Sequence, residues 1–302
     1  LRTDETLSMS EDPPVMVAAV DTIDKFAALA DRTVAMIQRG LITVERAKLV
    51  APGASAPDVP DVVKLTVYVG RHHRIGGSPA YRAVCAMLHQ HGFTGATVFL
   101  GVDGTAHGQR RRAHFFSRNI DVPIMIVAIG TGDRVSTVLS ELDELLDRPL
   151  LTVERAQLCK RGGELVTRPP ALPPTDDRGR EIWQQLMVHT SENALHDGVP
   201  FHRVMVRWLL RSATVRGASV LRGVWGYSDT GEPHRDKLFQ LGRRAPVTTI
   251  VVDSPERIAA TFDIVHEVTG SHGLGTSEMV PSATIVDGGS RSGSTGLADY
   301  EF

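Results

Sequence analysis

The sequence predicts an α+β protein built from tandem copies of one β-α-β-β-α-β module. A ten-residue stretch occurs twice, as LITVERAKLV at 41–50 and as LLTVERAQLC at 150–159. Seven of the nine residues that begin at Leu41 are identical to those that begin at Leu150. The same separation of 109 residues places DPPVMVAAV (12–20) on DVPIMIVAI (121–129). A register that holds without a gap from 12 to 50 indicates a duplicated domain and not a duplicated motif.

A third copy is fainter. GATVFLGVDG (95–104) matches GASVLRGVWG (217–226), and GGSPAYRAV (76–84) resembles DGVPFHRVM (197–205). Small changes in the spacing between these matches indicate single-residue insertions in loops, where insertions are tolerated.

These matches divide the chain into four parts. Residues 1–50 are the C-terminal half of a first copy, 61–160 a second copy, 181–286 a divergent third copy, and 287–302 a flexible tail. The first half of the first copy would occupy about 45 residues before Leu1. Either those residues are absent from this sequence, which we favour, or the half-copy pairs with something else. Linkers rich in Pro, Ala and Gly, at 51–60 and 161–180, separate the copies.

The first half of the second copy reads as strand, helix and strand. KLTVYVG (64–70) is apolar and β-branched and stops at a glycine, which favours a strand. Ser78 and Pro79 suit an N-cap and a first helical position, and apolar residues at helical spacing follow until Gly92. GATVFLG (95–101) is the second strand.

The second half repeats that order after a long loop at 102–120. PIMIVAI (123–129) is a strand, Asp133 can cap a helix with an apolar face, and 152–158 carry a last short strand. The order β-α-β-β-α-β is the ferredoxin-like plan, with both helices on one face of an antiparallel sheet. Because strands such as PIMIVAI are apolar on both sides, the other face must also be covered. We therefore expect the copies to pack sheet to sheet as an intramolecular pseudo-trimer.

Composition narrows the class of protein. The chain has 302 residues, a formal net charge of −2 and no apolar run long enough to span a membrane, so nothing points to nucleic acid or to a membrane protein. Two cysteines, Cys85 and Cys159, cannot form a disulfide framework, which favours a cytoplasmic location.

Four segments together resemble a known family: 64–70, 95–104, 121–129 and the closing turn at 150–158, which recurs at 41–49. They resemble the PII-like proteins of the domain-of-unknown-function 190 family. The resemblance implies a trimeric ferredoxin-like signal-transduction protein that is not an enzyme. It also implies a small anionic effector, such as an adenine nucleotide, in clefts between copies, and a protein partner, such as a membrane transporter, reached by the long loops.

The long loops carry the candidate ligand-binding residues. Anion binding needs exposed N–H groups and guanidinium groups, and both loops combine glycines with basic side chains. A solvated loop whose arginines aid solubility is the competing interpretation. The candidates are Gly101, Gly104, Arg110, Arg111, Arg112 and His114 in the second copy, and Gly223, Gly226, Arg235, Arg243 and Arg244 in the third.

The repeated TVER turn adds Glu45, Arg46, Glu154 and Arg155. These residues either form a local turn or reach the loop base of the next copy and close the cleft between copies. The third copy reads GLGTSEMVPSATI (273–285) and lacks the VERA core, so we expect the clefts to be non-equivalent.

No catalytic motif, nucleophile–base pair or metal-ligand set is recognisable, so we predict neither an enzyme nor a metal site. The predicted function is regulation through a small anionic effector or nucleotide bound between copies. The alternative is a protein-interaction scaffold that binds no small ligand and regulates a transporter or an enzyme.

Overall fold

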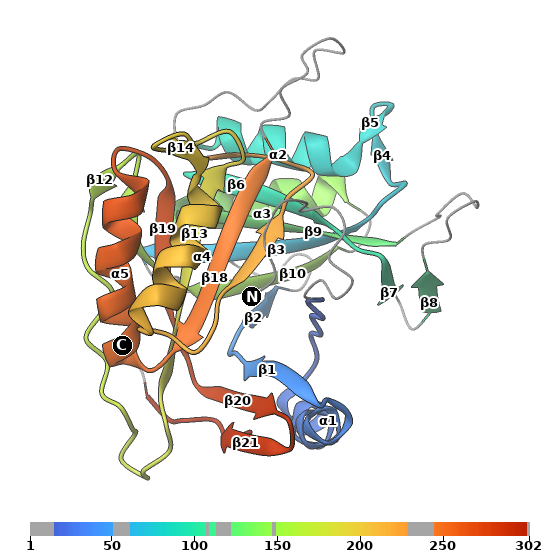
Figure 1. Cartoon of the computed structure of the whole chain (residues 1–302). Coiled ribbons are helices and arrows are strands. Elements are labelled where there is room, and N and C mark those ends of the chain that lie inside the picture. Colours follow the sequence, from blue (N-terminus) through green and yellow to red (C-terminus); the bar gives the residue numbers. More distant parts are fainter. Residues whose placement is uncertain are drawn as a thin grey trace.

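The computed structural model describes residues 15–50, 61–106, 109–112, 122–146, 149–228 and 245–300. The α+β class is confirmed. Figure 1 shows strands in the middle of the molecule and helices on three of its sides. No helix in the described ranges has both the length and the apolar character needed to cross a membrane.

The second copy forms one antiparallel sheet with two helices. Its elements follow the predicted order: β3 (Val62–Gly70), α2 (Ala80–Gln90), β6 (Gly95–Leu100), β9 (Pro123–Thr131), α3 (Gly132–Leu145) and β10 (Leu150–Arg155). In the sheet they lie in the order β6-β9-β3-β10. The apolar faces of α2 and α3 pack on one side of this sheet and form its core, with Leu65, Leu88, Ile126 and Leu142 fully buried.

The third copy repeats this arrangement. Its elements are β13 (Trp183–Ser191), α4 (Phe201–Ser212), β16 (Ser219–Arg222), β18 (Pro246–Asp253), α5 (Pro255–Thr269) and β19 (Leu274–Val280). They lie in the order β16-β18-β13-β19, and α4 and α5 enclose a second core around Leu186, Met205 and Phe262.

Each complete copy also has a short hairpin between its first strand and first helix. In the second copy it is β4 (Arg74–Ile75) with β5 (Ser78–Pro79), and in the third β14 (Leu195–His196) with β15 (Val199–Pro200). The prediction that Ser78 caps the helix is therefore wrong. Ser78 pairs in the hairpin, the helix begins at Ala80, and no side chain caps its first turn.

The second helix of this copy, α3, also begins two residues earlier than expected. It starts at Gly132 after Thr131, so Asp133 lies in the first turn instead of at the cap position. The pKa of Asp133 is lowered, first by a hydrogen bond with the Thr131 side chain, which keeps its negative charge near the helix N-terminus.

Within its described residues, the first copy contributes α1 (Ile23–Met36), β1 (Arg39–Val44) and the short strand β2 (Lys48–Val50). Residues 15–20, which match β9, belong to no strand. In the second copy β9 pairs with β3 and β6. The described residues hold no counterpart of those two strands for 15–20, so the segment has no ladder to join.

Short strands cross from each copy to the next. β2 (Lys48–Val50) pairs with β10, β11 (Gln157–Arg161) pairs with β19, and β20 (Ser282–Asp287) pairs with β1. The predicted single strand at 152–158 is therefore wrong, because Ala156 separates two strands that join different sheets.

The loops after β6 and β16 are partly regular. Within 102–120, β7 (Asp103–Ala106) pairs with β8 (Gln109–Arg112), where a continuous loop was predicted. After β16, β17 (Trp225–Ser228) crosses to the second copy and pairs with β6. This strand joins the base of the third copy's loop to the sheet of the second copy.

The end of the chain is not a loose tail up to residue 300. β21 (Ser290–Gly293) turns back onto β20, because Gly288 and Gly289 adopt the positive φ angles that a two-residue hairpin turn requires. Ala298 is fully buried beside Leu172 and Ile182. The 161–180 linker likewise holds a short strand, β12 (Glu164–Leu165), on β11.

Gly226 allows β17 to approach β6. Its φ is +150°, and a Cβ atom there would lie 2.2 Å from the carbonyl oxygen of Ala96. We expect Gly226→Ala to lower the free energy of unfolding by about 2 kcal/mol or more, because the strands must separate. Gly217→Ala is the matched control, since no atom lies within 4 Å of its Cβ position. Urea unfolding of both variants checks this, and equal midpoints would contradict it.

Candidate functional site

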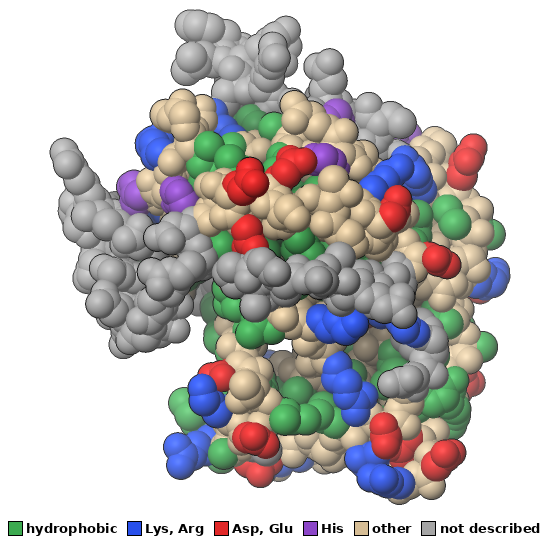
Figure 2. Space-filling view, turned by 180° about the vertical axis from the view of Figure 1, so that it is seen from behind, with side chains coloured by type: hydrophobic (Ala, Val, Ile, Leu, Met, Phe, Trp, Pro, Cys, Tyr) green, Lys and Arg blue, Asp and Glu red, His purple; other side chains and the backbone are tan. Residues whose placement is uncertain are grey.

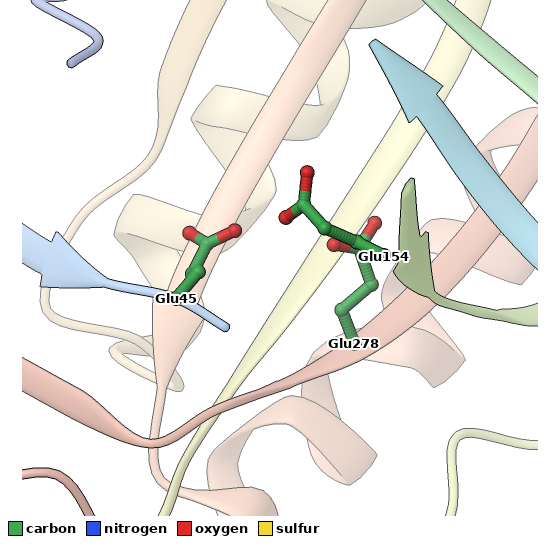
Figure 3. A group of neighbouring side chains, drawn as sticks. All are labelled: Glu45, Glu154 and Glu278. Carbon is green, nitrogen blue, oxygen red and sulfur yellow. The ribbon is translucent and has the colours of Figure 1, made fainter. Parts of the chain in front are cut away.

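One threonine-x-glutamate motif from each copy ends a strand at the same place. The motifs are Thr43-Val44-Glu45, of which Thr43 and Val44 end β1 and Glu45 follows it, Thr152-Val153-Glu154 in β10 and Thr276-Ser277-Glu278 in β19. Because each copy passes its next strand to a neighbour, the ends of β1, β10 and β19 converge. Figure 3 shows the three carboxyl groups, each carried by a different chain segment, gathered at one point.

Lys64 holds the three glutamates together. Its Nζ lies 2.5 Å from an oxygen of Glu278, 3.0 Å from Glu154 and 3.4 Å from Glu45. The Lys64 side chain is 8% exposed and that of Glu278 is 4% exposed. Lys64 comes from β3, where it sits directly opposite Glu154 in the antiparallel ladder. One ammonium group of the second copy therefore ties all three copies to one point.

The pKa of the Lys64 ammonium is raised well above its usual value. Burial by itself would lower that pKa, but attraction by Glu278, Glu45 and Glu154 outweighs it. Lys64 is consequently positively charged at neutral pH and at moderately alkaline pH.

The glutamates do not all carry charge. Burial is the largest influence on Glu154, and with repulsion from Glu278 and Glu45 it raises the pKa of Glu154 to about 8, despite attraction by Lys64. The pKa of Glu45 is lowered: burial opposes the lowering, but Lys64 and a hydrogen bond with Glu154 outweigh it. The raised pKa of Glu154 and the lowered pKa of Glu45 indicate that at neutral pH the two carboxyl groups share one proton.

The pKa of the Glu278 carboxyl group is raised as well. Burial raises its pKa and repulsion from Glu45 adds to this, while Lys64 opposes both. Its Oε2 contacts Lys64, whereas its buried Oε1 has no hydrogen-bond partner among the described residues. The cluster is therefore rich in acceptors and short of donors.

A cluster of three carboxylates also raises the question of a metal ion. One oxygen from each glutamate lies within 4.8 Å of the others, a spacing that would suit a hard cation. The Lys64 ammonium, however, already contacts all three carboxylates. The donor set is thus arranged around an ammonium group and does not fit a metal ion while Lys64 is in place.

The arginines of the two TVER motifs point elsewhere. Arg46 and Arg155 are exposed, while Glu45 and Glu154 turn inward. The two halves of the motif therefore separate, with the glutamates buried between copies and the arginines at the surface.

The loop glycines of the second copy lie where backbone segments meet. A Cβ at Gly101 would lie 2.4 Å from the carbonyl oxygen of Pro123, and one at Gly104 would lie 2.9 Å from the Pro123 ring. Strand β8 contains Arg110, Arg111 and Arg112. His114 lies outside the described residues.

The loop glycines of the third copy lie at the interface with the second. A Cβ at Gly223 would lie 2.8 Å from both Pro246 and Thr97, and Gly226 faces β6 as described above. Arg235, Arg243 and Arg244 lie outside the described residues. In the described part of both loops, the glycines therefore lie where a side chain would collide with a neighbouring segment.

The interface between the second and third copies is tightly packed around His189. The space lined by Thr97, Ile129, His189, Tyr227 and Leu274 has no room for a water molecule. Burial lowers the pKa of His189 to about 4, and its Nδ1 lies 3.0 Å from the hydroxyl of Thr248. This part of the interface is a neutral packed contact and not a ligand cleft.

Sequence reasoning missed Lys64 and Glu278. The signal for Glu278 was present: GTSEMV keeps the threonine-x-glutamate spacing of the two VERA turns, although it loses the Arg-Ala that follows. Lys64 stands at the start of an apolar strand pattern, and no local feature distinguishes it from an exposed strand lysine.

Comparison with known proteins agrees with the repeats. The model of the family DUF190, described as "Uncharacterized ACR", matches three separate segments, 1–49, 62–158 and 183–282. Together these cover most of the chain, which therefore belongs to the DUF190 family as a tandem array of its domain.

A curated relative has the size of one copy. The "UPF0166 protein" of Aquifex aeolicus (strain VF5) is 34% identical over 96 residues, which is 32% of this chain and 88% of that protein. The family resemblance stated from the sequence is thereby confirmed.

The proton on Glu154 makes stability depend on pH. Glu154 has a pKa of about 8 when folded and an ordinary value of 4.5. The folded state thus binds the proton more tightly, and this stabilisation is complete below pH 4.5 and is lost as the pH rises through 8. Glu154→Gln mimics the protonated acid, so we expect it to unfold at a higher temperature than the wild type at pH 8 and above.

Thermal unfolding at pH 5 to 9 tests this difference, with the exposed Glu164→Gln as the control. We expect the curve for Glu164→Gln to parallel the wild type, and Glu278 to leave some pH dependence in Glu154→Gln. Parallel curves for wild type and Glu154→Gln would contradict a protonated Glu154.

Lys64→Met removes the only cation that contacts the three glutamates among the described residues. Breaking a buried ion pair on one side costs about 3–5 kcal/mol, because uncompensated charge remains. We expect this loss at pH 7 and partial recovery at pH 5, where the carboxyl groups take up protons. Lys160→Met is the matched control, since Lys160 is equally buried but bonds Thr269 and the Gly270 carbonyl. Recovery of stability at pH 5 in both variants, or in neither, would contradict the role of Lys64 as the cation that neutralises the three glutamates.

Proposed function

We propose that this protein is a non-enzymatic regulator of the PII-like type, folded as a single-chain pseudo-trimer. The observation that supports this best is the set of strands that pass between copies. In such an arrangement a ligand or partner that binds one copy also acts on its neighbours.

The strand order supports ferredoxin-like modules. In both complete copies the fourth, first, third and second strands lie side by side, and the two helices lie on one face. This is the order of a split β-α-β fold. The first copy supplies the last helix and strand of the same module.

The crossing strands support a pseudo-trimer. The first copy pairs onto the second, the second onto the third, and the third back onto the first. Two of these contacts are equivalent residue by residue. Thr152 pairs with Leu49 and Thr276 pairs with Leu158, and these leucines are 109 positions apart, as are the two VERA turns.

The proposed effector is a small anion, in the class of adenine nucleotides, bound at the basic loops. β17 carries the base of the third copy's loop onto the second copy's sheet, and Arg82 of α2 lies 4.6 Å above the ring of Trp225 in that strand. A loop anchored in this way can transmit the binding of an anion from one copy to the next.

A binding role also agrees with the cysteines. Burial raises the pKa of both Cys85 and Cys159 to about 12, so neither is a nucleophile at neutral pH. The proposal therefore places no catalytic residue in this chain.

Thermal shift with ATP, ADP, AMP and cyclic AMP tests the proposed effector. A nucleotide at 100 times its dissociation constant adds about 2.7 kcal/mol of stability, which corresponds to roughly 5 °C or more. The combined variant Arg110→Ala/Arg111→Ala/Arg112→Ala should lose the shift. The control Arg207→Ala/Arg211→Ala/Arg291→Ala removes the same charge from other exposed sites and should keep it.

The absence of a shift with every nucleotide would contradict nucleotide binding and favour the alternative, a protein-interaction scaffold that binds no small ligand. Equal loss in the two triple variants would show that total charge, and not the loop, governs binding.

A further inference from the structure

The sheet of the third copy ends in an open strand edge. Among the described residues β16 is the outermost strand of that sheet, and only β18 pairs with it. Its equivalent in the second copy is β6, which lies 122 positions earlier and pairs with β9 on one side and with β17 on the other. The same strand of the repeat is therefore covered on both edges in the second copy and on one edge in the third.

The open edge of β16 offers backbone groups to a further strand. Gly223, which follows β16, donates its N–H to the first residue of β18. Because backbone groups alternate in direction along a strand, the N–H and C=O of Val220 point away from β18. The equivalent carbonyl in β6, that of Val98, accepts a hydrogen bond from the N–H of Val224, next to β17. Val220 therefore presents the groups with which β6 holds its covering strand.

The glycines of the two strands show the same difference. A Cβ atom at Gly95 in β6 would lie 2.8 Å from the Leu274 side chain and 3.3 Å from the Tyr227 carbonyl oxygen. Gly217 is the equivalent residue, and no atom of the described residues lies within 4 Å of its Cβ position. Leu41, which holds the place of Leu274 before its own threonine-x-glutamate motif, is 45% exposed, whereas Leu274 is 1% exposed. The contact that joins the second copy to the third is thus open between the third copy and the first.

The molecular surface is hollowed beside the first copy. Figure 2 shows a hollow between the part of the molecule that holds α1 and β1 and the rest of the described surface, with hydrophobic side chains along it. Val17 is 86% exposed and Met36 81%, and exposed apolar patches mark interaction sites. Because β1 pairs with β20, this part of the first copy adjoins the third copy. A partner at the β16 edge can therefore also bury apolar side chains of the first copy, which adds area that a four-residue ladder alone lacks.

The strand that fits the open edge is β7. It is the equivalent of β17, because Asp103–Ala106 lie 122 positions before Trp225–Ser228, and both strands have glycine as their second residue. β17 pairs with β6 of a neighbouring copy, whereas β7 pairs only with β8 of its own loop among the described residues. Figure 1 shows β7 and β8 at the periphery of the molecule. The chain therefore carries one strand of the covering type that covers no other copy.

The covering strand for β16 comes from another molecule. Within one molecule β7 stays at its own copy, where a Cβ at Gly104 would lie 2.9 Å from the Pro123 ring. A two-fold axis between two molecules lets each of them give one strand and receive one, which closes the assembly with two identical contacts.

We propose that β7 of a second copy of this chain pairs antiparallel with β16, in the register in which β17 pairs with β6, and that two molecules exchange these strands in a dimer. In this register Asp103 lies opposite Val220 and Ala106 lies opposite Gly217. The proposal rests on the repeat and on the observed pairing of β17, and not on the proposed effector.

Val220→Pro tests the open edge. Proline removes the N–H that points away from β18 and is tolerated on an edge strand, so the ladder with β18 is kept. We expect the wild type to sediment as a concentration-dependent dimer. Val220→Pro should weaken this association at least about tenfold, because each of the two contacts loses a backbone hydrogen bond. Val220→Ala is the matched control, since it shortens the same side chain but keeps the N–H, and it should still dimerise.

Hydrogen exchange of the wild type locates the contact. We expect the amides at 218–220 and at 103–105 to exchange at least about tenfold more slowly in concentrated than in dilute protein, because dimerisation pairs both strands. A dimer that protects neither segment, or that Val220→Pro leaves intact, would overturn the proposal.

A wild type that stays monomeric at every concentration would also overturn it, in favour of a different protein as the occupant of the β16 edge. Association is measured without nucleotide, so failure here and failure of the proposed effector are distinguishable.

Discussion

The structure depends on burying three carboxyl groups at one point. Like charges this close cannot all ionise in a poorly solvated site, so a cation and a shared proton are both required. Lys64 supplies the cation, and Glu154 with Glu45 holds the proton. Because each glutamate ends a strand of a different copy, the electrostatic requirement fixes where β1, β10 and β19 must meet. A shift of one copy along another would consequently separate a cluster glutamate from the Lys64 ammonium group.

Much of the fold could be predicted from the sequence because the repeat multiplies weak signals. The strand pattern of 64–70 and the helical spacing after Pro79 each have a counterpart in the third copy, and their order predicts the sheet of the second copy. The crossing strands could not be predicted. Ala156 divides one apparent strand into two because Gln157–Arg161 finds its partner in β19, more than a hundred residues away. The hairpin at Ser78 and the strand after Gly289 also depend on strand pairing. The local sequence pattern does not show which strands pair there.

The candidate site could be predicted only in part. Glu45 and Glu154 are recognisable because the TVER motif repeats, but its meaning lies in what the two residues meet. Lys64 looks like an ordinary strand lysine until β3 is placed in the centre of its sheet. The glycines of the loops suggested backbone freedom, yet Gly223 and Gly226 remove side-chain volume where two copies touch. Spacing along a chain does not show such contacts across an interface.

The return of β20 to β1 has a consequence for how the protein is made. Residues 39–44 leave the ribosome long before their strand partner at 282–287. Closing so large a loop is slow, and unpaired strand edges invite association with other chains in the interval. The second and third copies can form their own cores as they emerge, whereas β1 can pair with β20 only after residues 282–287 have been synthesised. The ladder between β1 and β20 can therefore form only in chains that have been translated at least through residue 287.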